Sequence, residues 1–288
     1  MSRSTIGPRN YGEVILRARI AVGVRYLVLI VAAATMVFPI LWVTLNAFRD
    51  NNQIYTNPFG FPHPVILTNF PDAFQSIHLW VKLANSVIYS GATVVITVLL
   101  ASMTAFYLAK FTQRNFIYLF FIMGIMIPIQ AILIPLFVDL RNLHLLNTRP
   151  GLTIIYVATN LSLAILILTG FMRKGIPDEL LAAAAIDGCG PLRAFFSVAL
   201  PVSTGGVVTV ATLVFLSIWN DFLLALVMLT SSSLKTLNLA VFLLRGQYSA
   251  EQGLLAAGAV ILMVPAIVIY IVFQEQVVKG LTAGAVKG

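Results

Sequence analysis

Few side chains in this 288-residue chain could carry out acid, base or metal chemistry. The three histidines and the single cysteine lack the spacing of a metal site, and they stand at His63, His78, His144 and Cys189. One cysteine also excludes a disulfide within the chain. The phosphate-loop pattern G-x-x-x-x-G-K-[ST] is absent, and so are the dinucleotide-binding, zinc-protease and nucleophile-elbow patterns. We therefore predict no catalytic residue, no metal site and no cofactor in this chain.

The polar side chains inside the apolar stretches are neutral, and they are several Ser and Thr together with the amides Asn46, Gln130, Asn160 and Asn220. An amide offers both donors and an acceptor, which suits a neutral solute rich in hydroxyl groups. We predict that Gln130, Asn160 and Asn220 line a path for such a solute. The alternative is that each amide joins two helices, as polar side chains in membrane bundles commonly do.

The composition places these residues in a membrane protein. Hydrophobic residues make up 59% of the chain, charged residues 10%, and the mean hydropathy is +0.96. An ordinary soluble domain has about 25% charged residues, so this chain cannot keep a polar coat. Six long stretches without Asp, Glu, Lys or Arg predict six transmembrane helices, each with the roughly 20 residues that a bilayer requires. These stretches are Tyr26–Phe48, Leu83–Ala109, Asn115–Val138, Pro150–Met172, Ala194–Asn220 and Gln252–Gln274.

A further charge-free stretch, Asn51–Pro71, has four prolines and four asparagines, and we expect an extramembrane loop there. The fifth span is expected to start late, after Pro201, and to run on into Phe222–Leu229. The predicted all-α chain thus divides into an N-terminal arm (1–25), a first helix (26–48), an extracytoplasmic loop (49–82), a core of five helices (83–279) and a tail (280–288).

The positive charges predict the orientation. The arm, the loops that follow spans two and four, and the tail together hold 12 Lys and Arg residues, and the opposite side holds 6. Because the side richer in Lys and Arg is the cytoplasmic one, we expect both termini inside. The net positive charge is then explained by membrane topology. The sequence has no patch of aromatic and basic residues that would point to nucleic-acid binding.

The cytoplasmic loop 173–201 has the features of a helical elbow. Pro177 and the acids Asp178 and Glu179 are typical of a helix start, and four alanines follow. Gly188 is placed to end that helix in a left-handed conformation, and Pro191 can begin a second helix, Leu192–Val198. We predict a docking element outside the membrane. The alternative is an amphipathic connector on the lipid surface.

This loop resembles the EAA loop of permease subunits of binding-protein-dependent ABC importers. That pattern is Glu-Ala-Ala, three residues, Gly, nine residues, an aliphatic residue, one residue, then Leu-Pro. Ala183-Ala184, Gly188, Val198 and Leu200-Pro201 fit it, whereas Ala182 stands where the pattern has glutamate. The resemblance implies that the loop couples the chain to an ATPase, through Ala182, Ala183, Ala184, Asp187, Gly188, Leu200 and Pro201.

Other segments resemble the maltose-type carbohydrate permeases. They are Trp219–Phe222, Gly246–Tyr248, the stretch 83–111 and the tail Gly280–Gly288. The resemblance implies the MetI-like fold in a bacterial or archaeal cytoplasmic membrane. It also implies a second homologous permease, two ATPase subunits that bind ATP and magnesium, and an extracytoplasmic sugar-binding protein. A flexible tail containing Gly280, Gly284 and Lys287 is expected to reach the ATPase pair.

Two alternatives remain at this point. A glycerol phosphate or polyol importer belongs to the same family, although a phosphate ester would favour Arg or Lys along the path. An ion-coupled secondary carrier would keep titratable groups at membrane depth, where the sequence offers only Asp221.

Overall fold

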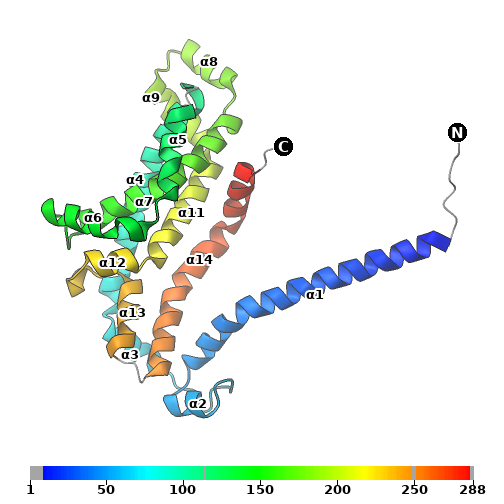
Figure 1. Cartoon of the computed structure of the whole chain (residues 1–288), viewed down its shortest axis with the longest axis vertical. Coiled ribbons are helices and arrows are strands. Elements are labelled where there is room, and N and C mark those ends of the chain that lie inside the picture. Colours follow the sequence, from blue (N-terminus) through cyan, green and yellow to red (C-terminus); the bar gives the residue numbers. More distant parts are fainter. Residues whose placement is uncertain (1–8, 113–114, 248–250, 286–288) are drawn as a thin grey trace.

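The computed structural model describes residues 9–112, 115–247 and 251–285, and in these ranges the chain is helical with no strand. Figure 1 shows the long helices α4, α7, α11 and α14 side by side, with α1 diverging from them. The long helices are α1 (Arg9–Asn46), α4 (Leu79–Lys110), α7 (Arg149–Gly175), α11 (Thr204–Asn220) and α14 (Gln252–Ala285). The short helices are α2 (Asn51–Thr56), α3 (Asn69–Ser76), α5 (Asn115–Met123), α6 (Ile129–Asn142), α8 (Asp178–Ile186), α9 (Pro191–Ala194), α10 (Leu200–Val202), α12 (Leu223–Met228) and α13 (Leu237–Gln247).

The predicted all-α membrane fold is confirmed. Four of the described helices are long and apolar enough to cross a bilayer, and six crossings result if each of two bent pairs forms one span. Helix α1 begins at Arg9 and so includes most of the segment 1–25 that the sequence assigned to a separate arm. The part of α1 that is most apolar has no buried residue, because α1 touches the bundle only near its end.

The third span is not the single helix predicted over Asn115–Val138. Helices α5 and α6 meet at 94°, on either side of Pro128. Proline has no N–H for the helix ladder and holds the preceding residue, Ile127, in an extended conformation. Figure 1 shows the consequence, since α6 runs across the bundle instead of along it.

The fifth span does start late, as predicted, and α11 begins at Thr204 after a 79° bend. The turn before the bend is widened into a π-helix, Phe195–Ala199. This wider turn accommodates Pro201, because the proline ring and its missing N–H disrupt an ordinary α-helical turn. Beyond the bend, Gly206 lets α11 approach α7, since a Cβ there would lie 2.7 Å from Cγ of Phe171. The predicted extension into Phe222–Leu229 is wrong, because α11 ends at Asn220 and α12 is a separate helix.

The predicted loop 49–82 is instead an ordered structure that contains α2, α3 and the start of α4. Arg49 is fully buried and donates to Asn46 Oδ1 at 2.9 Å and to backbone carbonyls of α2 and the segment after it. Asn69 Nδ2 donates to the carbonyls of Ala47 and Arg49, and Asn51 Oδ1 accepts from the first amide of α14 at 2.8 Å. Side-chain hydrogen bonds thus compensate for the helix-breaking composition.

The first turns of α4 hold the segment between α12 and α13. Asn85 Nδ2 donates to Ser233 O at 2.7 Å and to Lys235 O at 3.0 Å, and Lys82 Nζ donates to the Ser232 carbonyl. Arg149 of α7 in turn donates to Asn85 Oδ1 at 2.9 Å. Lys82, which the sequence assigned to a loop, is therefore a buried residue of α4.

The C-terminal tail is helical as far as Ala285, and so the prediction of a flexible tail is wrong for its described part. Gly280 and Gly284 lie within α14, while Lys287 lies outside the described residues. Helix α14 runs along the bundle toward the end that carries α8, whereas the first residues of α1 extend away from the bundle (Figure 1).

Candidate functional site: an elbow and a polar groove

The predicted elbow forms at one end of the bundle (Figure 1). Helix α8 begins after Pro177, with Asp178 and Glu179 in its first turn, where acids complement the helix dipole. It ends at Ile186 with Asp187 as its C-cap, and Gly188 follows with φ of +77°. The amide of Gly188 donates to Ala185 O at 3.0 Å and that of Cys189 to Ala184 O at 2.9 Å. These paired bonds are those of a Schellman motif, and they fix the direction in which the chain leaves α8.

Most residues of α8 are exposed, and few of them pack on the rest of the protein. Ala182 and Ala183 are exposed, Ala184 is buried, and Ile186 is 87% exposed. Asp187 and Gly188 lie in the exposed turn. The second helix of the elbow consists of α9 and the π-helix Phe195–Ala199 that continues it. Leu200 and Pro201 begin α10 directly after it, so the predicted coupling residues span the whole elbow.

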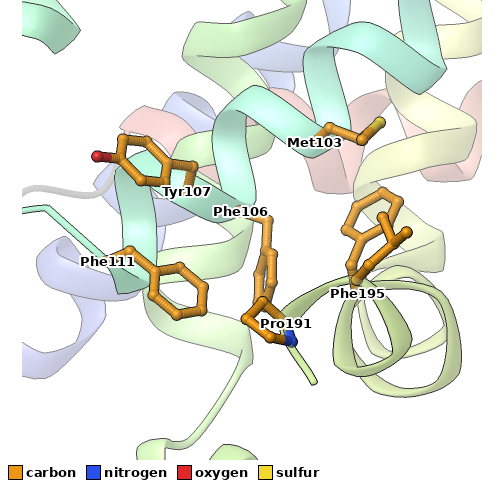
Figure 2. A pocket seen from close by; sticks show the side chains of 7 residues that line it. Met103, Phe106, Tyr107, Phe111, Pro191 and Phe195 are labelled. Atoms are coloured by element: carbon orange, nitrogen blue, oxygen red, sulfur yellow. The ribbon is translucent and has the colours of Figure 1, made fainter. Parts of the chain in front are cut away.

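Aromatic side chains fix the second helix of the elbow to the end of α4. The rings of Phe106 and Phe195 lie 5.8 Å apart, and that of Phe111 lies 5.3 Å from Phe106. Figure 2 shows Phe106, Pro191 and Phe195 close together beside a pocket of about 370 Å³. Its lining residues are apolar apart from Tyr107, whose hydroxyl points away from Phe106 and Pro191 in Figure 2. Sequence reasoning missed these residues, because aromatic residues near the end of a span are common in any membrane helix.

The end of α7 is also tied to its neighbours. The Arg173 guanidinium lies 4.8 Å from the ring centre of Tyr118 on α5, and it donates to Leu108 O of α4 at 3.5 Å. Lys110, the last residue of α4, forms an ion pair with Asp178 at 2.6 Å. The elbow therefore joins a rigid junction of α4, α5 and α7.

Two of the three predicted path residues lie together. Asn160 of α7 and Asn220 of α11 line a cavity of about 250 Å³, together with Tyr156, Thr159 and Asp221. Asn160 Nδ2 donates to Tyr156 O at 2.9 Å and Asn220 Nδ2 to Leu216 O at 2.8 Å, each within its own helix. Each of these bonds joins the amide to its own helix and not to another helix.

Gln130 does not line this cavity. It lies exposed on α6, next to Ile129, which does contribute to the lining. The bend between α5 and α6 moves Gln130 away from the position that a straight span would give it.

Asp221 has a structural role in the same cavity. Its carboxylate accepts a hydrogen bond from the Tyr156 hydroxyl at 2.8 Å and from the amides of Leu224 and Ala225 at 3.3 and 3.1 Å. The carboxylate thus caps α12 and joins it to α7.

A second cavity, of about 140 Å³, continues along α7 and α11 toward the elbow. It shares Asn160 and Ser217 with the first, and its other lining residues, from Leu163 to Ile167 and from Val210 to Val214, are apolar. The two cavities form a groove that is polar at the end near Asp221 and apolar toward the elbow.

The comparisons with known proteins agree with this arrangement. Residues 97–282 match the family described as the binding-protein-dependent transport system inner membrane component. A diacetylchitobiose uptake system permease protein of Streptomyces coelicolor is 33% identical, over 91% of this chain and 87% of that protein. A trehalose transport system permease protein of Mycobacterium tuberculosis is 34% identical, over 87% of this chain and 92% of its own. A chain of a bacterial ABC transporter that imports alginate shares the fold, with a TM-score of 0.74, 22% identity and coverage of 89% and 96%.

Proposed function

This chain belongs to the family of binding-protein-dependent transport system inner membrane components, and from that membership we propose that it is the permease subunit of an ATP-driven importer. Its solute is a neutral sugar or oligosaccharide, as the names of the diacetylchitobiose, trehalose and starch-product relatives support. The chain supplies the path through the cytoplasmic membrane, and ATP hydrolysis takes place on separate subunits that bind ATP and magnesium.

The observation that carries this proposal is the form of the elbow. One side of it, which includes Asp178 and Ala182, faces α4, whereas Ala183 and Ile186 are exposed and do not line the cavity between the elbow and α4. Small side chains allow close approach by another protein, and Ile186, which is 87% exposed, offers an apolar side chain for that contact. We place an ATPase subunit there, and hence place both termini in the cytoplasm with the elbow.

The groove along α7 and α11 supports the choice of a neutral solute. Its polar end has two amides, three hydroxyl-bearing side chains and a carboxylate, and no Lys or Arg lines either cavity. A phosphate ester would meet the Asp221 carboxylate without a cation to bind it, and so glycerol phosphate is disfavoured. A second permease closes the open side of the groove, and an extracytoplasmic binding protein delivers the sugar.

Asp221 also argues against an ion-coupled carrier. Three donors occupy its carboxylate and use it to cap α12. Protonating it in each transport cycle would break those bonds.

The experiment is purification from the native membrane, followed by reconstitution of the assembly with its binding protein and labelled oligosaccharide. We expect an ATPase and a second permease in the assembly, and uptake only with ATP. Asp187→Lys should weaken ATPase association. Glu251→Lys, the same charge change at an exposed site outside the elbow, should not. Uptake by the chain alone, driven by a proton or sodium gradient, would contradict the proposal.

A further inference from the structure

An ion pair joins the last residue of α4 to the first residue of α8. Lys110 Nζ lies 2.6 Å from Asp178 Oδ1. Helix α4 packs against α7 and α11, the two helices that line the groove, whereas α8 begins the elbow. The pair thus connects the proposed docking element directly to the core of the bundle.

The two partners are buried to very different extents. The Lys110 side chain is 9% exposed and that of Asp178 is 87% exposed. Lys110 lies in the wall of a cavity of about 420 Å³ between the end of α4 and the elbow. A nearly buried ammonium group is costly without a counter-charge, whereas a carboxylate in solvent at a helix start is not. Loss of the ion pair is therefore far less favourable for the Lys110 ammonium than for the Asp178 carboxylate.

Ala182 lies one turn farther along the same face of α8, four residues after Asp178. It lines the same cavity as Lys110 and Asp178. A carboxylate at position 182 would therefore project into the space beside the Lys110 ammonium. In this chain Asp178 supplies the counter-charge to Lys110, and position 182 has the small side chain of alanine.

A second contact is made one turn earlier on α4. Phe106 packs against Phe195 and Pro191 of the second elbow helix, as Figure 2 shows. The ion pair holds α8 and the ring contact holds the helix after Gly188, so both arms of the elbow attach to the same end of α4. An elbow held at two points cannot tilt without moving α4.

We propose that Lys110 and Asp178 are positioning residues that fix the elbow to α4, so that a movement imposed on the elbow passes to the helices along the groove. The transport part of this inference rests on the proposed function, since it takes the elbow to be where the ATPase acts. The attachment of α8 by the ion pair does not depend on it.

The chain's single cysteine provides a direct test of attachment. Cys189 follows Gly188 and lines the cavity between the elbow and α4. When α8 detaches, this thiol becomes more accessible to a maleimide reagent. In the purified permease, Asp178→Ala should raise the labelling rate by about two- to fivefold, the factor expected for one ion pair with a solvent-facing partner.

Two further variants separate the ion pair from other effects. Glu179→Ala removes an acid from the same first turn of α8, with the same loss to the helix dipole, and should leave the rate unchanged. Adding Ala182→Glu to Asp178→Ala should restore the slow rate, since the new carboxylate faces Lys110. Equal rates in Asp178→Ala and Glu179→Ala, or no rescue by Ala182→Glu, would overturn the attachment.

The same variants in the reconstituted assembly test transmission. Asp178→Ala should lower the ratio of solute uptake to ATP turnover, while the ATPase remains associated. If Asp178→Ala is labelled faster but keeps a normal ratio of uptake to ATP turnover, the transmission of movement is overturned and the attachment of α8 is not. Failure of the unaltered assembly to couple uptake to ATP would contradict the proposed function and leave the labelling result standing.

Discussion

Replacing Gly188 tests whether the shape of the elbow matters to its function. Gly188 has φ of +77°, and a Cβ built on it meets no atom within 4 Å. The Cβ of Gly188→Val therefore meets no other atom, and the cost that we expect comes from the backbone. A left-handed conformation costs a residue with a side chain about 1–2 kcal/mol, and a β-branched side chain lies at the upper end.

The strain acts on the hydrogen bonds that close α8. The amides of Gly188 and Cys189 donate to the carbonyls of Ala185 and Ala184. A penalty of about 1–2 kcal/mol raises the open population of this turn by about 5- to 30-fold. Hydrogen exchange at these two amides should accelerate by that factor in Gly188→Val, because exchange follows the open state.

Two matched variants accompany this one. Gly188→Asn keeps the turn, since asparagine tolerates the left-handed region, and exchange should rise only slightly. Gly190→Ser changes the next glycine, which has φ of −69° and precedes α9 as its N-cap, a position that suits serine. It should leave exchange unchanged.

The functional result follows from the local one. In the reconstituted assembly, Gly188→Val should lower uptake relative to ATP turnover, while Gly188→Asn and Gly190→Ser stay near the unaltered protein. If Gly188→Val shows faster exchange but normal uptake and turnover, the elbow is only a connector. If exchange itself is unchanged, the left-handed turn is not what holds α8 in place.

Two other predictions concern the groove and its walls. Gly206→Leu should lower the stability of the detergent-purified permease by about 1–3 kcal/mol, because the leucine side chain would overlap the Phe171 ring on α7. Gly205→Ala is the control, since a Cβ there makes only an ordinary contact at 3.9 Å. Equal melting temperatures of the two variants would refute the close approach of α11 to α7. Asn160→Leu and Asn220→Leu should each change the rate or selectivity of sugar uptake while assembly persists, whereas Gln130→Leu should have a smaller effect since it lies outside the cavity. Normal uptake in all three variants would show that the amides only support the helices.

The sequence by itself determined the class of protein and the elbow. Apolar runs of more than 20 residues allow only membrane helices, because lipid satisfies no backbone hydrogen bond. Pro177, the alanine run and Gly188 are local signals, and the structure forms α8 and its left-handed end where they predict. Propensity and capping act within a few residues, so they can be inferred without knowing what lies nearby.

The tertiary structure alone decided which residues meet. Lys110 and Asp178 are 68 residues apart in the chain, and nothing in their local sequence pairs them. Asn160 and Asn220 share a cavity because α7 packs against α11, while the bend at Pro128 moves Gln130 away from it. The sequence showed the proline but not the direction of the bend, which depends on how the helices pack. Hydropathy reports that a segment prefers lipid, but the contacts between helices set the site, and those depend on side-chain shape across the whole bundle.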